Sequence, residues 1–139
     1  MATRSTIAIR NADTTVTGIY CHWDGYLSYN GKILVKNYAT EAAVRELIAL
    51  GDLSSLGPTI GVKVNSNDPA AHKDQCVAYG RDRGETGVDA TTFGSWREML
   101  NKVGEGYNYL FVPGEGWYVD YDGRRGLVVN EMTEKEMAQ

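Results

Sequence analysis

The stretch STIAIRNADTTVTGIYCHW, residues 5–23, predicts a β-hairpin. Ile7 and Ile9 are expected on one face and Thr6, Ala8 and Arg10 on the other, which is the period-2 pattern of a strand. The segment Asn11–Thr14 supplies turn chemistry, because Asn and Asp side chains bond their own backbone. A second strand is expected over Val16–Trp23. The hairpin is the first of several signals that favour an antiparallel sheet.

Further strands are expected at 59–64, 76–79, 88–93, 107–112, 117–121 and 127–129, where apolar residues recur between turn residues. The strands at 107–112 and 117–121 form a second predicted hairpin around a Pro-Gly-Glu-Gly turn. Between the strands, 52–57 is interpreted as one short extra turn and 65–74 as an exposed polar loop.

Three helices are expected. The first covers Tyr26–Tyr38, with Tyr26, Tyr29, Ile33 and Asn37 on one stripe. The second begins after an N-cap at Thr40 and ends before Gly51. The third begins at a capping box formed by Ser95 and Glu98. Its stripe is interpreted as core and consists of Trp96, Met99, Leu100 and Val103.

These elements predict an α+β fold, in which an antiparallel sheet of hairpin-linked strands carries about three helices packed on one face. The length of 139 residues is typical of one domain. We therefore expect a single α+β domain at 1–130, followed by a charged, flexible tail at 131–139.

Composition limits the function classes. The formal net charge is −4, and an acidic chain does not favour general nucleic-acid binding, which depends on neutralising phosphates. The apolar runs are far shorter than the ~20 residues that span a bilayer, so no membrane partner is expected. The start of the chain lacks the apolar segment of an export signal, which favours the cytoplasm with reduced thiols.

The most unusual stretch is Tyr20–Tyr26, YCHWDGY, where a predicted strand meets a predicted helix. One interpretation is a ligand-binding wall formed by His22, Trp23, Asp24 and Tyr26, with rings for stacking and polar groups for a phosphate or ribose. The alternative is structural, with Trp23 in the core and a hydrogen bond between His22 and Asp24.

A second candidate is the charged, glycine-rich loop 80–87, GRDRGETG. Arg81 and Arg83 are planar forks that suit phosphate. The alternative is that Asp82 and Glu85 hold both arginines in surface ion pairs. The loop matches neither the dinucleotide-binding nor the P-loop motif.

No metal, cofactor or catalytic residue is assigned. Potential zinc ligands lack paired spacing; they are Cys21, His22, His72 and Cys76. An Mg²⁺ set rests on residue type alone and comprises Asp24, Asp82 and Glu85. Only two histidines are present, and Asp24 is too close in sequence to orient His22 in a triad.

Several segments resemble small accessory proteins encoded by tailed bacteriophages and prophages. They are STIAI, IYCHWDGY, NGKIL, LIALGDLSSLG, YGRDRGE and the closing YLF and WYVDY, which extend the resemblance over Arg4–Asp120. The family brings no established activity, so it assigns no residue a role. It implies a phage protein that acts in the cytoplasm of an infected bacterium.

By analogy, that context implies an anti-defence sponge that sequesters a small phosphorylated nucleotide-type immune signal. Such proteins are commonly homo-oligomers, and tyrosine-rich surfaces suit interfaces. One alternative is a phosphodiesterase that cleaves the signal, with His22 as acid and base. Another is a protein-binding inhibitor that docks on a host defence enzyme through its acidic surface.

Overall fold

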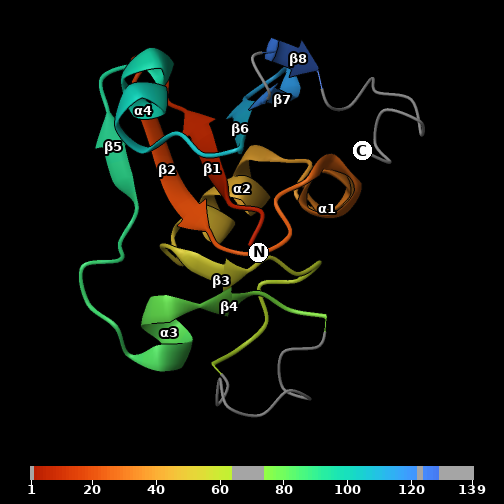
Figure 1. Cartoon of the computed structure of the whole chain (residues 1–139), viewed down its shortest axis with the longest axis vertical. Coiled ribbons are helices and arrows are strands. Elements are labelled where there is room, and N and C mark those ends of the chain that lie inside the picture. The colour runs from red at the N-terminus through yellow and green to blue at the C-terminus, as the bar shows by residue number, and fades with distance from the viewer. Residues whose placement is uncertain (1, 64–73, 122–123, 129–139) are drawn as a thin grey trace.

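Figure 1 shows the computed structural model of the chain, which describes residues 2–63 and 74–121 and the backbone of 124–128. The predicted tail at 131–139 and nearly all of the predicted loop at 65–74 lie outside the described residues. In chain order the elements are β1 (Ser5–Arg10), β2 (Val16–Cys21), the π-helix η1 (Leu27–Gly31), α1 (Lys32–Asn37), α2 (Glu41–Ile48), β3 (Leu53–Ser55), β4 (Val77–Ala78), α3 (Tyr79–Arg83), β5 (Thr91–Phe93), α4 (Trp96–Val103), β6 (Tyr107–Val112), β7 (Gly116–Tyr121) and β8 (Arg124–Val128).

The sheet is mixed. Seven strands lie in the order β4-β3-β2-β1-β6-β7-β8, and β5 pairs with β2 outside this row. The predicted hairpins β1–β2 and β6–β7 are antiparallel, but β1 pairs parallel with β6 and β2 pairs parallel with β3. The prediction of a purely antiparallel sheet is therefore wrong. Hairpin signals report pairing between chain neighbours, whereas the β1–β6 pair joins Ser5 to Tyr107.

Helices cover both faces of the sheet, not one. On one face Ile7 and Ile9 pack with residues of α1 and α2. On the other face the intervening Ala8 packs with Met99 of α4, which lies across the strands from α2 (Figure 1). Successive strand residues point to opposite faces, so the α+β class is confirmed while the expected one-sided packing is not.

Local capping signals are confirmed. The Thr40 hydroxyl accepts from the N–H of Ala43, and the Ser95 hydroxyl accepts from the N–H of Glu98. Each bond satisfies a donor that the first turn leaves free. The Glu98 carboxylate accepts from the N–H of Gly94, immediately before the cap.

The first predicted helix is formed differently. It begins as the π-helix η1 and continues as α1 to Asn37. The wider i→i+5 turn shifts the side-chain pattern, so Leu27, Asn30 and Leu34 are buried. Tyr29, which we predicted on the stripe with Tyr26 and Ile33, is 40% exposed.

Two short assignments between α2 and β4 are wrong. The expected turn at 52–57 contains β3, and residues 59–63 of the expected strand at 59–64 form no strand. Two backbone carbonyl oxygens in this segment accept hydrogen bonds from side chains: Arg81 donates to the Ile60 carbonyl, and Gln75 donates to the Val62 carbonyl. Those oxygens are therefore bound to side chains rather than to a neighbouring strand.

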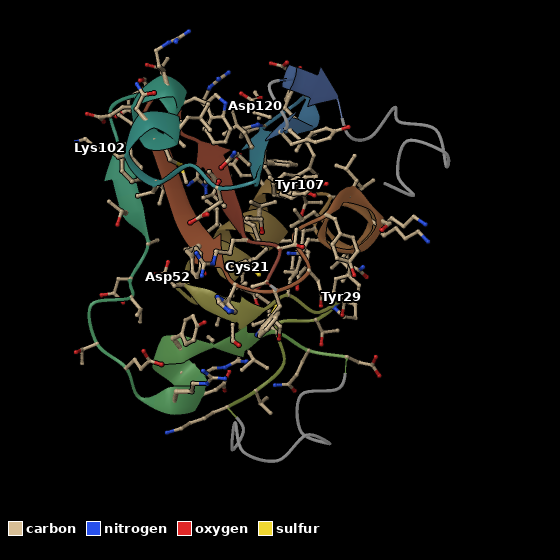
Figure 2. All side chains as sticks on the ribbon, in the orientation of Figure 1. Cys21, Tyr29, Asp52, Lys102, Tyr107 and Asp120 are labelled. Atoms are coloured by element: carbon tan, nitrogen blue, oxygen red, sulfur yellow. The ribbon has the colours of Figure 1, made fainter. Side chains whose placement is uncertain are left out.

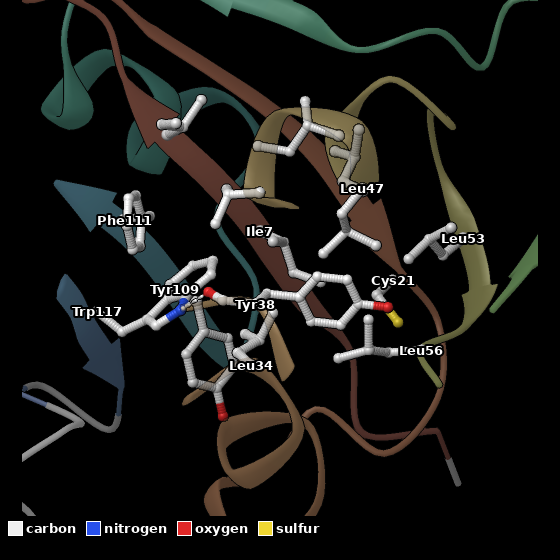
Figure 3. Close-up of a cluster of buried hydrophobic side chains, with 14 of the residues drawn as sticks. Ile7, Cys21, Leu34, Tyr38, Leu47, Leu53, Leu56, Tyr109, Phe111 and Trp117 are labelled. Atoms are coloured by element: carbon white, nitrogen blue, oxygen red, sulfur yellow. Dashed lines mark hydrogen bonds between the residues drawn. The ribbon is translucent and has the colours of Figure 1, made fainter. Parts of the chain in front are cut away.

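The larger core lies between the sheet and α1 and α2, and it buries several ionisable groups (Figure 3). Burial raises the pKa of the Cys21 thiol from 9.0 to about 12. It also raises the pKa of the Tyr38 and Tyr109 phenols well above their usual value. The Tyr38 hydroxyl donates to the Gly57 carbonyl and the Tyr109 hydroxyl to the Gly25 carbonyl.

We expect the protein to lose stability in alkali. Between about pH 9 and pH 12 the unfolded chain releases the Cys21 proton while the folded chain retains it. The free energy of unfolding is therefore undiminished below about pH 9 and falls as the pH rises towards 12. Urea unfolding at a series of pH values measures this, and Cys21→Ala is expected to shallow the decline. An unfolding free energy independent of alkaline pH would contradict the burial of these groups.

Candidate ligand-binding site

The segment after β2 follows β3 and then turns into η1. The N–H of His22 donates to the Leu53 carbonyl at 3.0 Å, and that of Trp23 donates to the Ser54 carbonyl at 3.1 Å. The Trp23 side chain is 44% exposed and meets the His22 ring edge-on, with 4.6 Å between centroids. The alternative that placed Trp23 in the core is therefore wrong.

Hydrogen bonds around this turn differ from the expected pair. His22 Nδ1 lies 2.6 Å from the Tyr20 hydroxyl, whereas Asp24 Oδ1 accepts from the Tyr26 hydroxyl at 3.3 Å. Asp24 has a φ of 58°, in the left-handed region that Asp tolerates better than most residues. Each polar side chain thus bonds a tyrosine, and the predicted His22–Asp24 bond is not formed.

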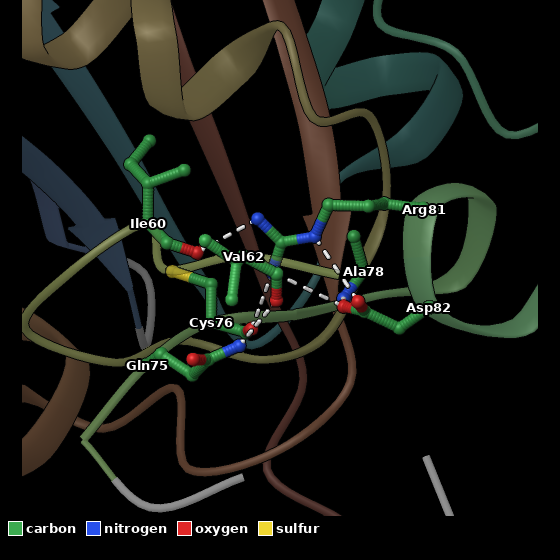
Figure 4. A network of polar contacts seen from close by, with 7 residues as sticks. All are labelled: Ile60, Val62, Gln75, Cys76, Ala78, Arg81 and Asp82. Atoms are coloured by element: carbon green, nitrogen blue, oxygen red, sulfur yellow. Dashed lines mark hydrogen bonds and ion pairs between the residues drawn. The ribbon is translucent and has the colours of Figure 1, made fainter. Parts of the chain in front are cut away.

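The Arg81 side chain forms hydrogen bonds and an ion pair within the protein (Figure 4). Its guanidinium donates to the carbonyls of Ile60 and Cys76 at 2.8 and 2.9 Å. Its Nε atom also lies 3.1 Å from Oδ1 of Asp82 in an ion pair, and the Asp82 side chain is fully buried. The ion pair expected between Asp82 and an arginine is therefore formed by Arg81, but it is buried and not on the surface. The Arg81 donors face the protein's own oxygens rather than an open site.

Arg83 lies differently from Arg81. The predicted loop begins within α3, which ends where Gly84 takes a left-handed φ of 69°. Arg83 is exposed, its guanidinium lies over the Tyr79 ring at 5.2 Å, and Nη2 reaches the Ser54 hydroxyl at 3.5 Å. Because Ser54 also bonds the backbone of Trp23, the structure brings Arg83 towards the His22–Trp23 segment. Arg81 instead points towards the carbonyls of Ile60 and Cys76.

A cavity of about 470 Å³ lies on the face of the sheet opposite α1 and α2. We call it the α4 groove, because α4 forms one wall and strands β1, β6 and β7 form the other. Its polar and aromatic lining comprises Arg10, Trp96, Arg97, Glu115, Tyr118 and Asp120. Asp120 lies on β7 beside α4 (Figure 2). Ligand sites commonly have volumes of about 300–1,000 Å³.

Two carboxylates hold the aromatic rings of the α4 groove. The indole N–H of Trp96 donates to Asp120 Oδ2 at 3.3 Å, and the Tyr118 hydroxyl donates to Glu115 Oε1 at 2.5 Å. Such bonds to a charged acceptor are stronger than neutral ones. The polar atoms of both rings are therefore bound within the protein.

Two arginines complete the lining of the α4 groove. Arg10 ends β1 and is half-buried, and Arg97 lies in the first turn of α4 and is exposed. Neither guanidinium group forms a hydrogen bond or ion pair with the residues that the structure describes. By contrast, Arg45 on α2 pairs with Glu41 at 2.8 Å. Arg10 and Arg97 are thus available to an anion.

The sequence interpretation missed this groove for an identifiable reason. Of the stripe assigned to the core, only Met99 is buried, whereas Trp96 and Leu100 are half-buried and Val103 is 43% exposed. Met99 occupies the space above Gly18, where a Cβ atom would collide with Met99 Cε. One signal was present, because strand alternation places Arg10 on the same face as Ala8.

A second cavity, of about 390 Å³, lies on the other side of α4 and is lined by Tyr20, Asp52 and Lys102, among others. The Asp52 carboxylate accepts from the Tyr20 N–H at 2.9 Å. This bond lies between the stretches of β2 that pair with β3 and β5. Burial raises the pKa of Asp52. The Asp52 carboxylate therefore accepts a hydrogen bond from a backbone N–H of β2.

In the part of the chain that the structure describes, no group of three or more His, Cys, Asp and Glu side chains is arranged to hold a metal ion. Cys21 and Cys76 are buried free thiols, and His72 lies outside the described residues. None of the described helices has both the length and the hydropathy to cross a bilayer.

Comparison with known proteins gives no relative from which a function could be inferred. No protein-family model matches the chain, and neither the curated proteins nor the solved structures contain a match.

Proposed function

We propose that the protein binds a small phosphorylated, nucleotide-type ligand in the α4 groove without converting it. The observation that carries this proposal is that Arg10 and Arg97, whose guanidinium groups have no partner among the described residues, line one groove with two aromatic rings whose polar atoms are already bound. A guanidinium binds phosphate through two parallel hydrogen bonds. A planar base stacks on an indole or phenol ring at about 1–3 kcal/mol per base.

The net charge of the chain is compatible with this site. The protein is acidic overall, but one small anion needs only a local pair of cations, unlike a long nucleic acid. Among the described residues, those that line the groove include no histidine, cysteine or serine, so we favour capture over cleavage. His22, on which the phosphodiesterase alternative depends, does not line this groove.

We further propose that capture withdraws a nucleotide immune signal in the cytoplasm of a bacterial host, and that the protein acts as a homo-oligomer. The support for the host and its signal is the resemblance to phage accessory proteins. The support for self-association is the analogy with such proteins, together with the exposed ring of Tyr29. The alternative of an inhibitor that docks on a host defence enzyme would be supported by pull-down of a host protein with unchanged capture by groove variants.

Calorimetric titration with mononucleotides and 3′,5′-cyclic mononucleotides tests the site. Arg97→Ala and Arg10→Ala are each expected to weaken binding by about 1.5–3 kcal/mol, the usual contribution of a charge-assisted hydrogen bond. Arg97→Lys is expected to restore little, because an ammonium lacks the planar fork. Chromatography after incubation is expected to recover the ligand intact.

Arg83→Ala is the matched control, because Arg83 is also exposed but lies at the end of the sheet near Ser54. It is expected to bind like the parent. If Arg83→Ala weakened binding while the groove variants did not, the site would instead be the surface formed by His22, Trp23, Asp24, Tyr26 and Arg83. Conversion of the ligand would favour the phosphodiesterase.

A further inference from the structure

We infer that the α4 groove selects guanine nucleotides, with the Glu115 carboxylate reading the base; this inference rests on the proposed binding of a nucleotide there. The groove combines two arginines that have no partner among the described residues with a carboxylate that has accepting capacity left. A ligand that fits both carries an anionic group at one end and adjacent hydrogen-bond donors at the other.

Glu115 is held at the rim of the groove. It lies in the β6–β7 turn, where its N–H donates to the Val112 carbonyl at 2.9 Å. Its Oε1 atom accepts from the Tyr118 hydroxyl. Its other oxygen, Oε2, has no hydrogen-bond partner among the residues of 2–63 and 74–121. An ionised carboxylate has about four acceptor positions, so most of the acceptor capacity of Glu115 is open to a ligand.

Asp120 is the other carboxylate of the groove and is less suited to this task. It is 8% exposed, and its Oδ2 atom already accepts from the Trp96 indole. Glu115 is exposed, and its bond to Tyr118 places it beside a ring that a base would stack on. Glu115 is therefore the carboxylate that a base edge can approach.

The base that matches a carboxylate is guanine. Its N1–H and N2–H groups are adjacent donors, so they form two parallel bonds to one carboxylate. Adenine has an acceptor, N1, at the same place. An ionised carboxylate only accepts hydrogen bonds, so the two acceptors repel each other. Hypoxanthine keeps N1–H but lacks the exocyclic amine. A site that uses a ligand's donors discriminates against an analogue without them, because its own polar groups lose their partners.

The sheet separates the two ends of the groove by a suitable distance. Arg10 lies on β1 and Tyr118 on β7, with β6 between them. Neighbouring strands are about 4.8 Å apart, so β1 and β7 are separated by roughly 10 Å. A mononucleotide that stacks on Tyr118 with its base edge at Glu115 is thus long enough to reach Arg10 with its phosphate, and Arg97 lines the same groove from α4.

Calorimetric titration with GMP, IMP and AMP tests the inference. We expect GMP to bind at least about tenfold more tightly than AMP, with IMP between them. Glu115→Gln is expected to weaken GMP by about tenfold and to leave AMP unchanged or strengthened, because a neutral amide neither attracts two donors nor repels N1. Glu41→Gln is the matched control, since Glu41 also accepts one side-chain bond but lies on α2; it is expected to change nothing.

The results separate the two proposals. Equal binding of AMP and GMP, or equal strengthening of all three ligands by Glu115→Gln, would overturn base selection and leave Glu115 as a charge that repels phosphate. If that binding still depended on Arg97, the proposed nucleotide function would stand. If none of the three nucleotides bound, base selection would fail; the proposed nucleotide function would fail with it if the pyrimidine and cyclic mononucleotides did not bind either.

Discussion

Trp117→Ala is expected to lower the free energy of unfolding by about 3–5 kcal/mol, the range for large aromatic side chains removed from a core. Trp117 on β7 is 1% exposed. Its ring meets Phe111 at 5.2 Å between centroids, and its indole N–H donates to the Tyr38 carbonyl at 2.9 Å. The substitution therefore removes apolar contact and leaves the carbonyl at the end of α1 without this donor.

Urea unfolding of the parent and variant measures this loss. Trp117→Phe is the control, because it keeps a ring in the core while it removes the indole N–H, so a smaller loss is expected. Comparing the slopes against urea concentration shows whether the two unfolded states expose similar surface. A loss below about 1 kcal/mol for Trp117→Ala would mean that the core between the sheet and α1 is not packed as described.

Asp82→Ala is expected to have a comparable effect, about 3–5 kcal/mol, because it removes one partner of a buried ion pair. The Asp82 side chain is fully buried, and that of Arg81 is 18% exposed. Asp82 also accepts from the Ala78 N–H at 2.7 Å, at the point where β4 passes into α3. Without the carboxylate, the Arg81 charge loses its neutralising partner and the Ala78 N–H loses its acceptor.

Asp82→Asn is the control for this variant. An asparagine oxygen still accepts from the Ala78 N–H, but it lacks the charge that pairs with Arg81, so an intermediate loss is expected. Nucleotide affinity, measured by calorimetry at a temperature where the variants remain folded, is expected to match that of the parent. An early-melting variant with unchanged affinity would mark the Arg81–Asp82 pair as structural. Normal melting with weakened binding would assign the pair to the ligand.

The candidate site was only partly accessible from the sequence. Strand alternation correctly placed Arg10 on the face shared by Thr6 and Ala8, and the capping box correctly placed the start of α4. A stripe at helical spacing, however, does not distinguish a side chain that fills a core from one that lines a cavity. Trp96 and Leu100 line the groove and are half-buried, whereas Met99 is the one residue of α4 that is fully enclosed against the sheet.

The sequence by itself determined the local structure: the β1–β2 and β6–β7 hairpins, the caps at Thr40 and Ser95, and the α+β class. These features depend on residues a few positions apart, whose turn and capping chemistry acts in any tertiary context. The tertiary structure alone decided that β1 pairs with β6 and that Arg10 and Arg97 line one groove. Periodicity shows which side chains share a face of a strand or helix, but the partner of that face is set by packing between segments far apart in the chain.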